Sequence, residues 1–309
     1  MKKYNLTARP GQAGLTLIEL LVSLVIGLLL AIVASATYLY SKQAYNAVSE
    51  NSQMEENGRL ALNLLTRNIQ SAGYITVNLD NEIAPTNRKI FGCEFGMINP
   101  QGASSTADFG CLSSLPAGTT QSGSIAMFYQ TDASNVTGPN YQGVDCIGNA
   151  PVQVTNSGST VTNTFEINAH FFVSRTAVAT PNGTTTMGQL SCATDPTRST
   201  IPRAFVLPQP LIAGIHQIRA RYVLPTLNDA TAPGGNIFDA IDFQSTPLRF
   251  DEVVQVDLCV LTKAIQASGN DAGSDVTDCY GNIFTPLPSQ SYRRFTTTVN
   301  LRNRTEAPI

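Results

Sequence analysis

The stretch GLTLIELLVSLVIGLLLAIVASATYLY, residues 14–40, holds a single charged side chain, Glu19. As a helix with a rise of about 1.5 Å per residue, residues 15–40 extend over roughly 39 Å, which exceeds the hydrocarbon core of a bilayer. Leucine, isoleucine, valine and alanine occupy every face of this helix rather than one stripe. The pattern therefore predicts a membrane span and not an amphipathic surface helix.

The residues around this span allow three interpretations of its processing. The first is an ordinary cleaved signal peptide. Residues 1–14 carry Lys2, Lys3 and Arg9 and no acid, and Ala34-Ser35-Ala36 fits the small-x-small pattern of a signal peptidase site. The apolar core of a signal peptide is usually shorter, roughly 7–15 residues, and rarely contains a glutamate. The second interpretation is a plain anchor that is never cleaved.

The third interpretation explains the acid. The segment Gly14-Leu15-Thr16-Leu17-Ile18-Glu19 resembles the processing site of type IV prepilins, where a basic leader ends in glycine and a glutamate follows shortly after. The resemblance implies that a prepilin peptidase cleaves between Gly14 and Leu15 and that Leu15 is then N-methylated. The family more often has phenylalanine at this new N-terminus. Many of its major pilins also have a proline midway along the helix, which this span lacks.

The physical cost of Glu19 favours the same interpretation. A carboxylate at the centre of a membrane costs about 2.5–3.5 kcal/mol on insertion scales, so it needs a partner. Cleavage after Gly14 creates an ammonium group on Leu15, one helical turn from Glu19 and on roughly the same face. When such helices bundle in a filament, the carboxylate of one subunit can meet the ammonium of a neighbour. The alternative is that Glu19 reaches the lipid headgroups and has no role in assembly.

The residues after the span continue the helix. Residues 41–73 contain no proline, and Gly73 suits the left-handed position that ends a helix. We expect this part to be amphipathic, with an apolar stripe made of Tyr45, Val48, Leu60, Leu64 and Ile69. The first half of the helix would then lie in lipid or in a fibre core, and the second half would pack on a globular head.

Beyond the helix, the sequence predicts β-strands by alternation of apolar and polar side chains. Two of the apolar sets are Val254, Val256, Leu258, Val260 and Phe295, Thr297, Val299, Leu301. A third strand places Ile218, Ala220 and Tyr222 on one face and Gln217, Arg219 and Arg221 on the other. SIAMFYQ (124–130) and FEINAHFFVS (165–174) are further candidates. The predicted fold is α+β, a long N-terminal helix packed on an antiparallel sheet head.

Two regions make the resemblance to type IV pilins more specific. MEENGRLALNLLTRNIQSAGY (54–74) is similar to the corresponding helix of PilW-type minor pilins and, more loosely, of J-type pseudopilins of type II secretion. DEVVQVDLCVLTKA (251–264) and YRRFTTTVNLRNR (292–304) look like the last strands of PilW-type proteins. The expected organisation is a leader (1–14), a transmembrane or filament-core helix (15–40), an amphipathic helix (41–73) and an extracytoplasmic β-rich head (74–309).

The resemblance implies a minor subunit of a type IV pilus that acts in assembly or priming, at or near the tip. The implied partners are other minor and major pilins, prepilin peptidase, the inner membrane and the pilus assembly platform. The chain would cross the bacterial inner membrane once, with its head in the periplasm, and later reach the fibre at the cell surface. Two alternatives stay open: a J-type pseudopilin, and a membrane-anchored extracytoplasmic binding protein that does not polymerise.

Six cysteines follow the span, namely Cys93, Cys111, Cys146, Cys192, Cys259 and Cys279, and none forms C-x-x-C. This spacing argues against zinc and favours up to three disulfides in an oxidising compartment. Six cysteines allow 15 pairings, and the sequence does not choose among them. We take pairing between neighbours, 93–111, 146–192 and 259–279, as a working hypothesis; the alternative is that some are buried free thiols.

No pattern of residues predicts catalysis or a cofactor. The two histidines, His170 and His216, lie in strand-like apolar stretches, and there is neither a G-x-S-x-G elbow nor a P-loop. The net charge is −3, and removing the +3 leader leaves −6, so bulk charge does not indicate nucleic acid binding. One weak Ca²⁺ candidate, without EF-hand spacing, is the acidic loop with Asp271, Asp275 and Asp278.

Overall fold

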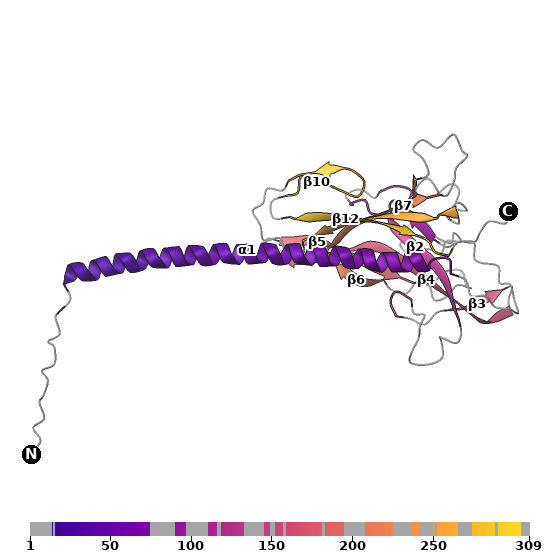
Figure 1. The fold of residues 1–309 in the computed structure, drawn as a ribbon, viewed down its shortest axis with the longest axis horizontal. Coiled ribbons are helices and arrows are strands. Elements are labelled where there is room, and N and C mark those ends of the chain that lie inside the picture. Colours follow the sequence, from indigo (N-terminus) through magenta and orange to yellow (C-terminus); the bar gives the residue numbers. More distant parts are fainter. Residues whose placement is uncertain are drawn as a thin grey trace, which may run out of the picture. The chain divides into compact units, whose positions relative to one another are not determined.

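The computed structural model (Figure 1) describes residues 14, 16–74, 90–96, 111–115, 119–132, 145–148, 152–156, 159–180, 183–194, 208–224, 237–240, 250, 252–264, 274–287 and 290–303. The chain forms two compact units, residues 1–49 and residues 50–309. The first consists, where described, almost entirely of helix, and the second contains the end of the same helix and all the described strands.

Helix α1 runs without interruption from Leu17 to Ser71. The predicted helix and its predicted end are confirmed, because Gly73 has a φ of 75° and follows the last helical turn. Its N–H group donates a hydrogen bond of 2.7 Å to the carbonyl oxygen of Phe128. The chain therefore leaves the helix in a left-handed conformation that glycine adopts without steric cost, and it is held there by the first sheet.

The buried face of α1 differs from the predicted stripe. Tyr45, Val48 and Leu60 are 74%, 69% and 52% exposed, Leu64 is only partly buried, and Ile69 alone of the predicted set is fully buried. The helix instead buries Met54, Gly58, Ala61, Leu65 and Ile69, and Ala72 just after its end is buried as well. The prediction was wrong because it followed the large aliphatic side chains. Small residues such as Gly58 and Ala61 let the helix backbone approach the sheet, so they lie on the contact face.

All described strand pairs are antiparallel. The first sheet has the order β1-β2-β4-β5-β6, with β3 paired to β4. Its strands are β1 (Ile90–Cys93), β2 (Ser124–Asp132), β3 (Val152–Asn156), β4 (Ser159–Thr180), β5 (Gly183–Ala193) and β6 (Gln209–Ala213). The predicted strands 124–130 and 165–174 lie within β2 and β4 and are confirmed.

The second sheet has the order β12-β9-β7-β8. Its strands are β7 (Ile215–Val223), β8 (Ile237–Asp239), β9 (Gln255–Lys263) and β12 (Tyr292–Asn300). Two short strands, β10 (Val276–Thr277) and β11 (Ile283–Phe284), pair with each other. The α+β fold with antiparallel sheets is therefore as the sequence predicts.

One apolar cluster joins the end of the helix to both sheets. It includes Ala61, Leu65 and Ile69 from α1, Ile125 and Phe171 from the first sheet, and Ile218, Tyr222, Val256 and Leu258 from the second. The predicted inward faces of β7 and β9 are thus confirmed. Gln217 is an exception, since it was assigned to the polar face and is only 1% exposed. A loop that covers this position accounts for its burial, as described below.

Candidate processing and assembly site

The first turn of α1 is organised around Thr16 and Glu19. The Thr16 N–H group and the Thr16 hydroxyl each lie 3.5 Å from Oε2 of Glu19, while the Glu19 N–H group donates to Thr16 Oγ1 over 3.4 Å. This reciprocal arrangement is a capping box, in which each side chain satisfies a backbone donor that the helix leaves free. The carboxylate also lies where the helix dipole favours negative charge. Gly14 and Thr16 are exposed, and Leu15 lies outside the described residues.

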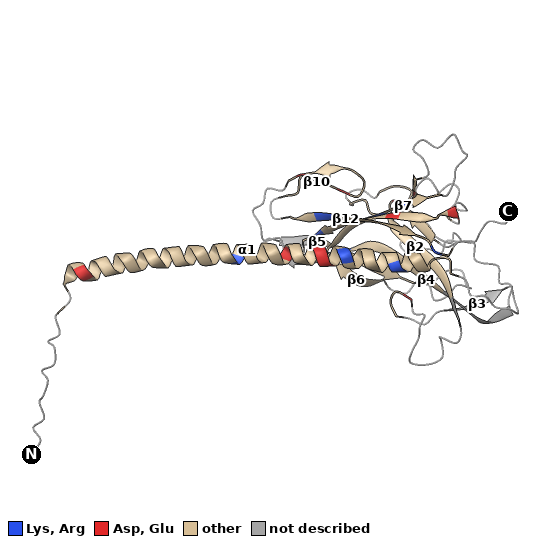
Figure 2. Cartoon of the chain, viewed as in Figure 1, with Lys and Arg blue, Asp and Glu red and all other residues tan. Residues whose placement is uncertain are grey.

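The rest of the first unit presents apolar side chains to the outside. From Leu17 to Tyr40 the large hydrophobic side chains are between 52% and 79% exposed. In Figure 2 this part of α1 is tan apart from the acidic residue near its start. The helix is long and apolar enough to cross a membrane. A surface of this kind is stable in lipid or against other apolar helices but not in water.

Three disulfides join the six cysteines in the second unit. They are Cys93–Cys111, Cys146–Cys192 and Cys259–Cys279, the same pairs as in the working hypothesis. No described cysteine is a free thiol. The sulfur atoms link β1 to a following segment, a turn to β5, and β9 to the loop after β10, so each bridge fixes a loop against a strand.

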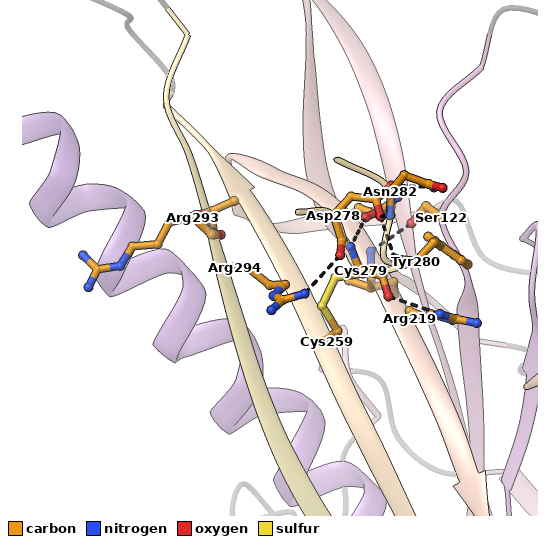
Figure 3. The surroundings of a disulfide bond; sticks show 12 residues. Ser122, Arg219, Cys259, Asp278, Cys279, Tyr280, Asn282, Arg293 and Arg294 are labelled. Carbon is orange, nitrogen blue, oxygen red and sulfur yellow. Dashed lines mark hydrogen bonds between the residues drawn. A yellow bond between two sulfur atoms is a disulfide. The ribbon is translucent and has the colours of Figure 1, made fainter. Parts of the chain in front are cut away.

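The loop at the third bridge is held by a dense set of polar contacts (Figure 3). Oδ1 of Asp278 accepts hydrogen bonds from the N–H groups of Tyr280 and Asn282, both over 2.8 Å. The buried side chain of Gln217 accepts from the Cys279 N–H over 2.8 Å and donates to the Gln121 carbonyl over 2.9 Å. A buried amide is tolerable only when both of its ends are paired, and here they are.

Arg219 connects this loop to the first sheet. Its guanidinium lies 2.7 Å from Oδ1 of Asp239 and 3.4 Å from Oε1 of Glu94, and it donates to the Cys279 carbonyl over 3.3 Å. It also lies 4.5 Å from the ring centroid of Tyr280, whose hydroxyl donates to the Glu94 carbonyl over 3.0 Å. Glu94 is only 5% exposed, so it depends on this cation. We call Glu94, Arg219, Asp239 and Tyr280 the Arg219 network.

The two described members of the Ca²⁺ candidate, Asp275 and Asp278, accept hydrogen bonds from protein donors. Oδ1 of Asp275 accepts from the Thr285 hydroxyl over 2.6 Å, and both carboxylate oxygens of Asp278 accept hydrogen bonds within the loop. Asp271 lies outside the described residues. Among the described residues, no group of three histidine, cysteine, aspartate or glutamate side chains comes together. Asp275 and Asp278 therefore act in turn formation here.

The two histidines lie apart, on β4 and β7. His170 is 1% exposed and packs edge-on against Phe128. His216 packs edge-on against Tyr292 with 5.1 Å between ring centroids. Burial first, and then the charges of Arg175 and Lys263, lower the pKa of His216 to about 4. At neutral pH this imidazole is therefore uncharged and serves packing.

Two known protein families match parts of the chain. Residues 9–35 match the prokaryotic N-terminal methylation motif, and residues 170–303 match type IV pilus-assembly protein W. An apolar exposed helix with this motif, followed by an antiparallel sheet head, defines a type IV pilin. Within this class the chain is similar to minor pilins of the PilW type, because the second match covers the strands from β5 to β12.

No curated protein gives a significant match to the chain. A solved structure of a type IV-like pilin from Thermus thermophilus aligns with 81% of this chain and 97% of its own, at 12% identity and a TM-score of 0.38. That likeness is too low to add to the assignment.

Sequence reasoning missed two features of this region. The capping box was visible as Thr-x-x-Glu at residues 16–19, and the T-x-x-E pattern is a sequence signal for a helix start. The Arg219 network left no such signal. Tyr280 and Glu94 are 186 residues apart, and alternation placed Arg219 on a polar face without naming a partner.

Proposed function

We propose that this minor pilin is cleaved between Gly14 and Leu15, methylated on Leu15, and recruited into an assembling type IV pilus through the first part of α1. Its partners would be other minor and major pilins, with prepilin peptidase and the assembly platform acting before them. The head would lie in the periplasm while α1 is in the inner membrane, and at the cell surface once the subunit is in the fibre.

The observation that carries this proposal is Glu19, a carboxylate in the first turn of an otherwise exposed apolar helix. In the membrane the acid lies close to the headgroups. In a fibre the helices bundle and water leaves, so the carboxylate is stable only beside a cation. The new ammonium group on Leu15 of a neighbouring subunit provides that cation. The pair fixes the axial register, because apolar helices alone slide past one another.

The second unit supports a role in few copies. Residues 50–309 form a large head with three disulfides and two main sheets. A head of this size is easier to accommodate where neighbours are few. We therefore place the subunit in a priming complex or at the fibre tip, rather than along the shaft, and assign it a structural role.

Because of the capping box, the charge of Glu19 can be tested separately from its role in capping the helix. Glu19→Gln removes the charge, but glutamine still serves in a capping box, so the helix start is preserved. Thr16→Ala removes the cap, at a cost of about 0.5–2 kcal/mol, and keeps the charge. Both variants are expressed in a strain that lacks the native protein. Sheared fibres and membranes are then compared for their content of the subunit, and the mature N-terminus is determined by mass spectrometry.

We expect Glu19→Gln to be cleaved after Gly14 and inserted normally, but to be depleted from fibres or to reduce the number of pili. Thr16→Ala should be incorporated nearly as well as the wild type. A lower fibre content for Thr16→Ala than for Glu19→Gln would show that Glu19 acts only as a helix cap. A mature N-terminus at Thr37 would indicate an ordinary signal peptide and overturn the proposal altogether.

A further inference from the structure

A cluster of side chains from several strands surrounds Tyr292 at the start of β12. The rings of His216 and Phe284 each lie 5.1 Å from the Tyr292 ring, and Nζ of Lys263 lies 5.7 Å from its centroid. Arg175 joins from β4, since its Nη2 donates to the His216 carbonyl over 3.3 Å. We call these five residues the Tyr292 cluster. None of them belongs to the helix or to the Arg219 network.

Among the described residues, Arg175 and Lys263 of this cluster form no ion pair with an acid. Arg175 donates through Nη2 to the carbonyl oxygens of Thr120 and His216, both over 3.3 Å, which leaves Nε and Nη1 for other acceptors. The ammonium group of Lys263 makes a cation–π contact with the Tyr292 ring. Within the part of the chain that the structure describes, the ion pairs of the head use other cations, namely Arg59, Arg219, Arg221 and Arg293.

The surroundings do not neutralise these charges. Burial first, and then the charge of Arg175, lower the pKa of Lys263. Asp278 is the acid that acts on His216, but its carboxylate already accepts hydrogen bonds from Tyr280 and Asn282. A partly buried cation is poorly hydrated and weakly screened, so two of them in contact with the same His216–Tyr292 pair favour an anion from outside.

We propose that Arg175 and Lys263 form a site for an oxyanion, either a carboxylate or a phosphate group, next to Tyr292. Arg175 would donate to the anion through Nη1 or Nε, and Lys263 would act as a point charge. The neutral imidazole of His216 adds no charge that competes for the anion, and its ring marks one edge of the site. This site is independent of the N-terminal helix, so it does not rest on the proposed role of Glu19.

The test uses the full chain in a non-ionic detergent and follows the imidazole NMR signals. The protein has only two histidines, so the His216 signals are readily assigned with a His170→Gln sample. Sodium phosphate and, separately, sodium N-acetylglutamate are titrated against sodium chloride of equal ionic strength. We expect a saturable shift of the His216 signals with at least one oxyanion and none with chloride. Saturation by phosphate alone identifies a phosphate group as the ligand, and saturation by the carboxylate identifies an acidic side chain.

Three variants define the site. Lys263→Gln should raise the dissociation constant of the oxyanion by at least about tenfold, as expected for loss of a charged hydrogen bond. Arg175→Lys keeps the charge but loses the Nη1 and Nε donors, and should also weaken binding. Arg302→Gln changes an exposed arginine at the end of β12 and should leave binding unchanged. The proposal is overturned if neither oxyanion saturates, if chloride acts equally, or if folded Lys263→Gln binds as the wild type does.

Discussion

The ring of Phe295 on β12 lies so close to Gly58 on α1 that a Cβ atom at Gly58 would overlap it. Next to this contact, Arg293 of β12 donates to Oε2 of Glu55 over 2.9 Å, and Arg59 pairs with the same carboxylate. The helix therefore meets the last strand of the sheet through a glycine, with ion pairs at its edge. Any other residue at position 58 would require the Phe295 ring to move.

We expect Gly58→Ala to destabilise the head, although alanine is a better helix former by about 1 kcal/mol. Forcing a methyl group into a packed contact typically costs about 1–3 kcal/mol, so the net effect should be a lower unfolding temperature. Near-UV circular dichroism on heating measures it. Gly27→Ala is the matched control, because an added Cβ there meets nothing within 4 Å. Adding Phe295→Leu to Gly58→Ala should restore part of the loss; a double variant no more stable than the single one would contradict the assigned contact.

Arg219→Met should be one of the most damaging single changes to the head. It leaves the carboxylate of Glu94 buried without its cation, and breaking a buried pair in this way costs about 3–5 kcal/mol. Arg221→Met, two residues away, removes an exposed arginine that lies 3.7 Å from Asp257, and should cost no more than about 1 kcal/mol. Urea unfolding of both variants checks the difference. Equal losses would mean that the Arg219 network contributes no more than a surface pair.

His216 should make the head less stable in mild acid. Its pKa is about 4 in the folded protein, chiefly because of burial, and about 6.5 in an unfolded chain. The unfolded state therefore binds more protons between these values, so the free energy of unfolding falls as pH drops from about 6.5 to about 4. The full effect is on the order of 3 kcal/mol.

His216→Gln should flatten this dependence, since glutamine does not titrate. Chemical unfolding of the wild type and the variant at a series of pH values between 4 and 7 isolates the contribution of His216 from that of the carboxylates. Parallel curves for the two proteins would contradict the assignment of this slope to His216.

Non-reducing peptide mapping of the purified protein should recover the three pairs Cys93–Cys111, Cys146–Cys192 and Cys259–Cys279. Replacing Cys259 and Cys279 together by serine should lower stability by about 3 kcal/mol in the chain-entropy model for a loop of this size. The loop should still dock, because Gln217 and Arg219 hold it independently of the sulfur atoms. Rapid proteolysis between residues 274 and 287 in the serine variant would show that the bridge alone holds the loop.

Periodicity predicted the strands well, because β7 and β9 each bury one face and expose most of the other to solvent or loop. The same reasoning failed on α1, where Gly58 and Ala61 mark the contact face and Leu60 does not. Size and hydrophobicity do not indicate which side of a helix a flat sheet will approach. The motif around Gly14 and Glu19 could be identified from local spacing alone. Contacts such as that between Tyr280 and Glu94 depend on how the two sheets meet, and no local pattern encodes that.

The disulfides have a further consequence for how the chain matures. Of the 15 ways to pair six cysteines, the one observed joins the first to the second, the third to the fourth and the fifth to the sixth along the chain. The three closed loops therefore follow one another without overlap. On the proposed route, in which the head is exported after the helix, the first oxidation partner that each new thiol meets is the native one. The disulfides can then form while the chain is being translocated, and no isomerisation of mispaired bridges is needed.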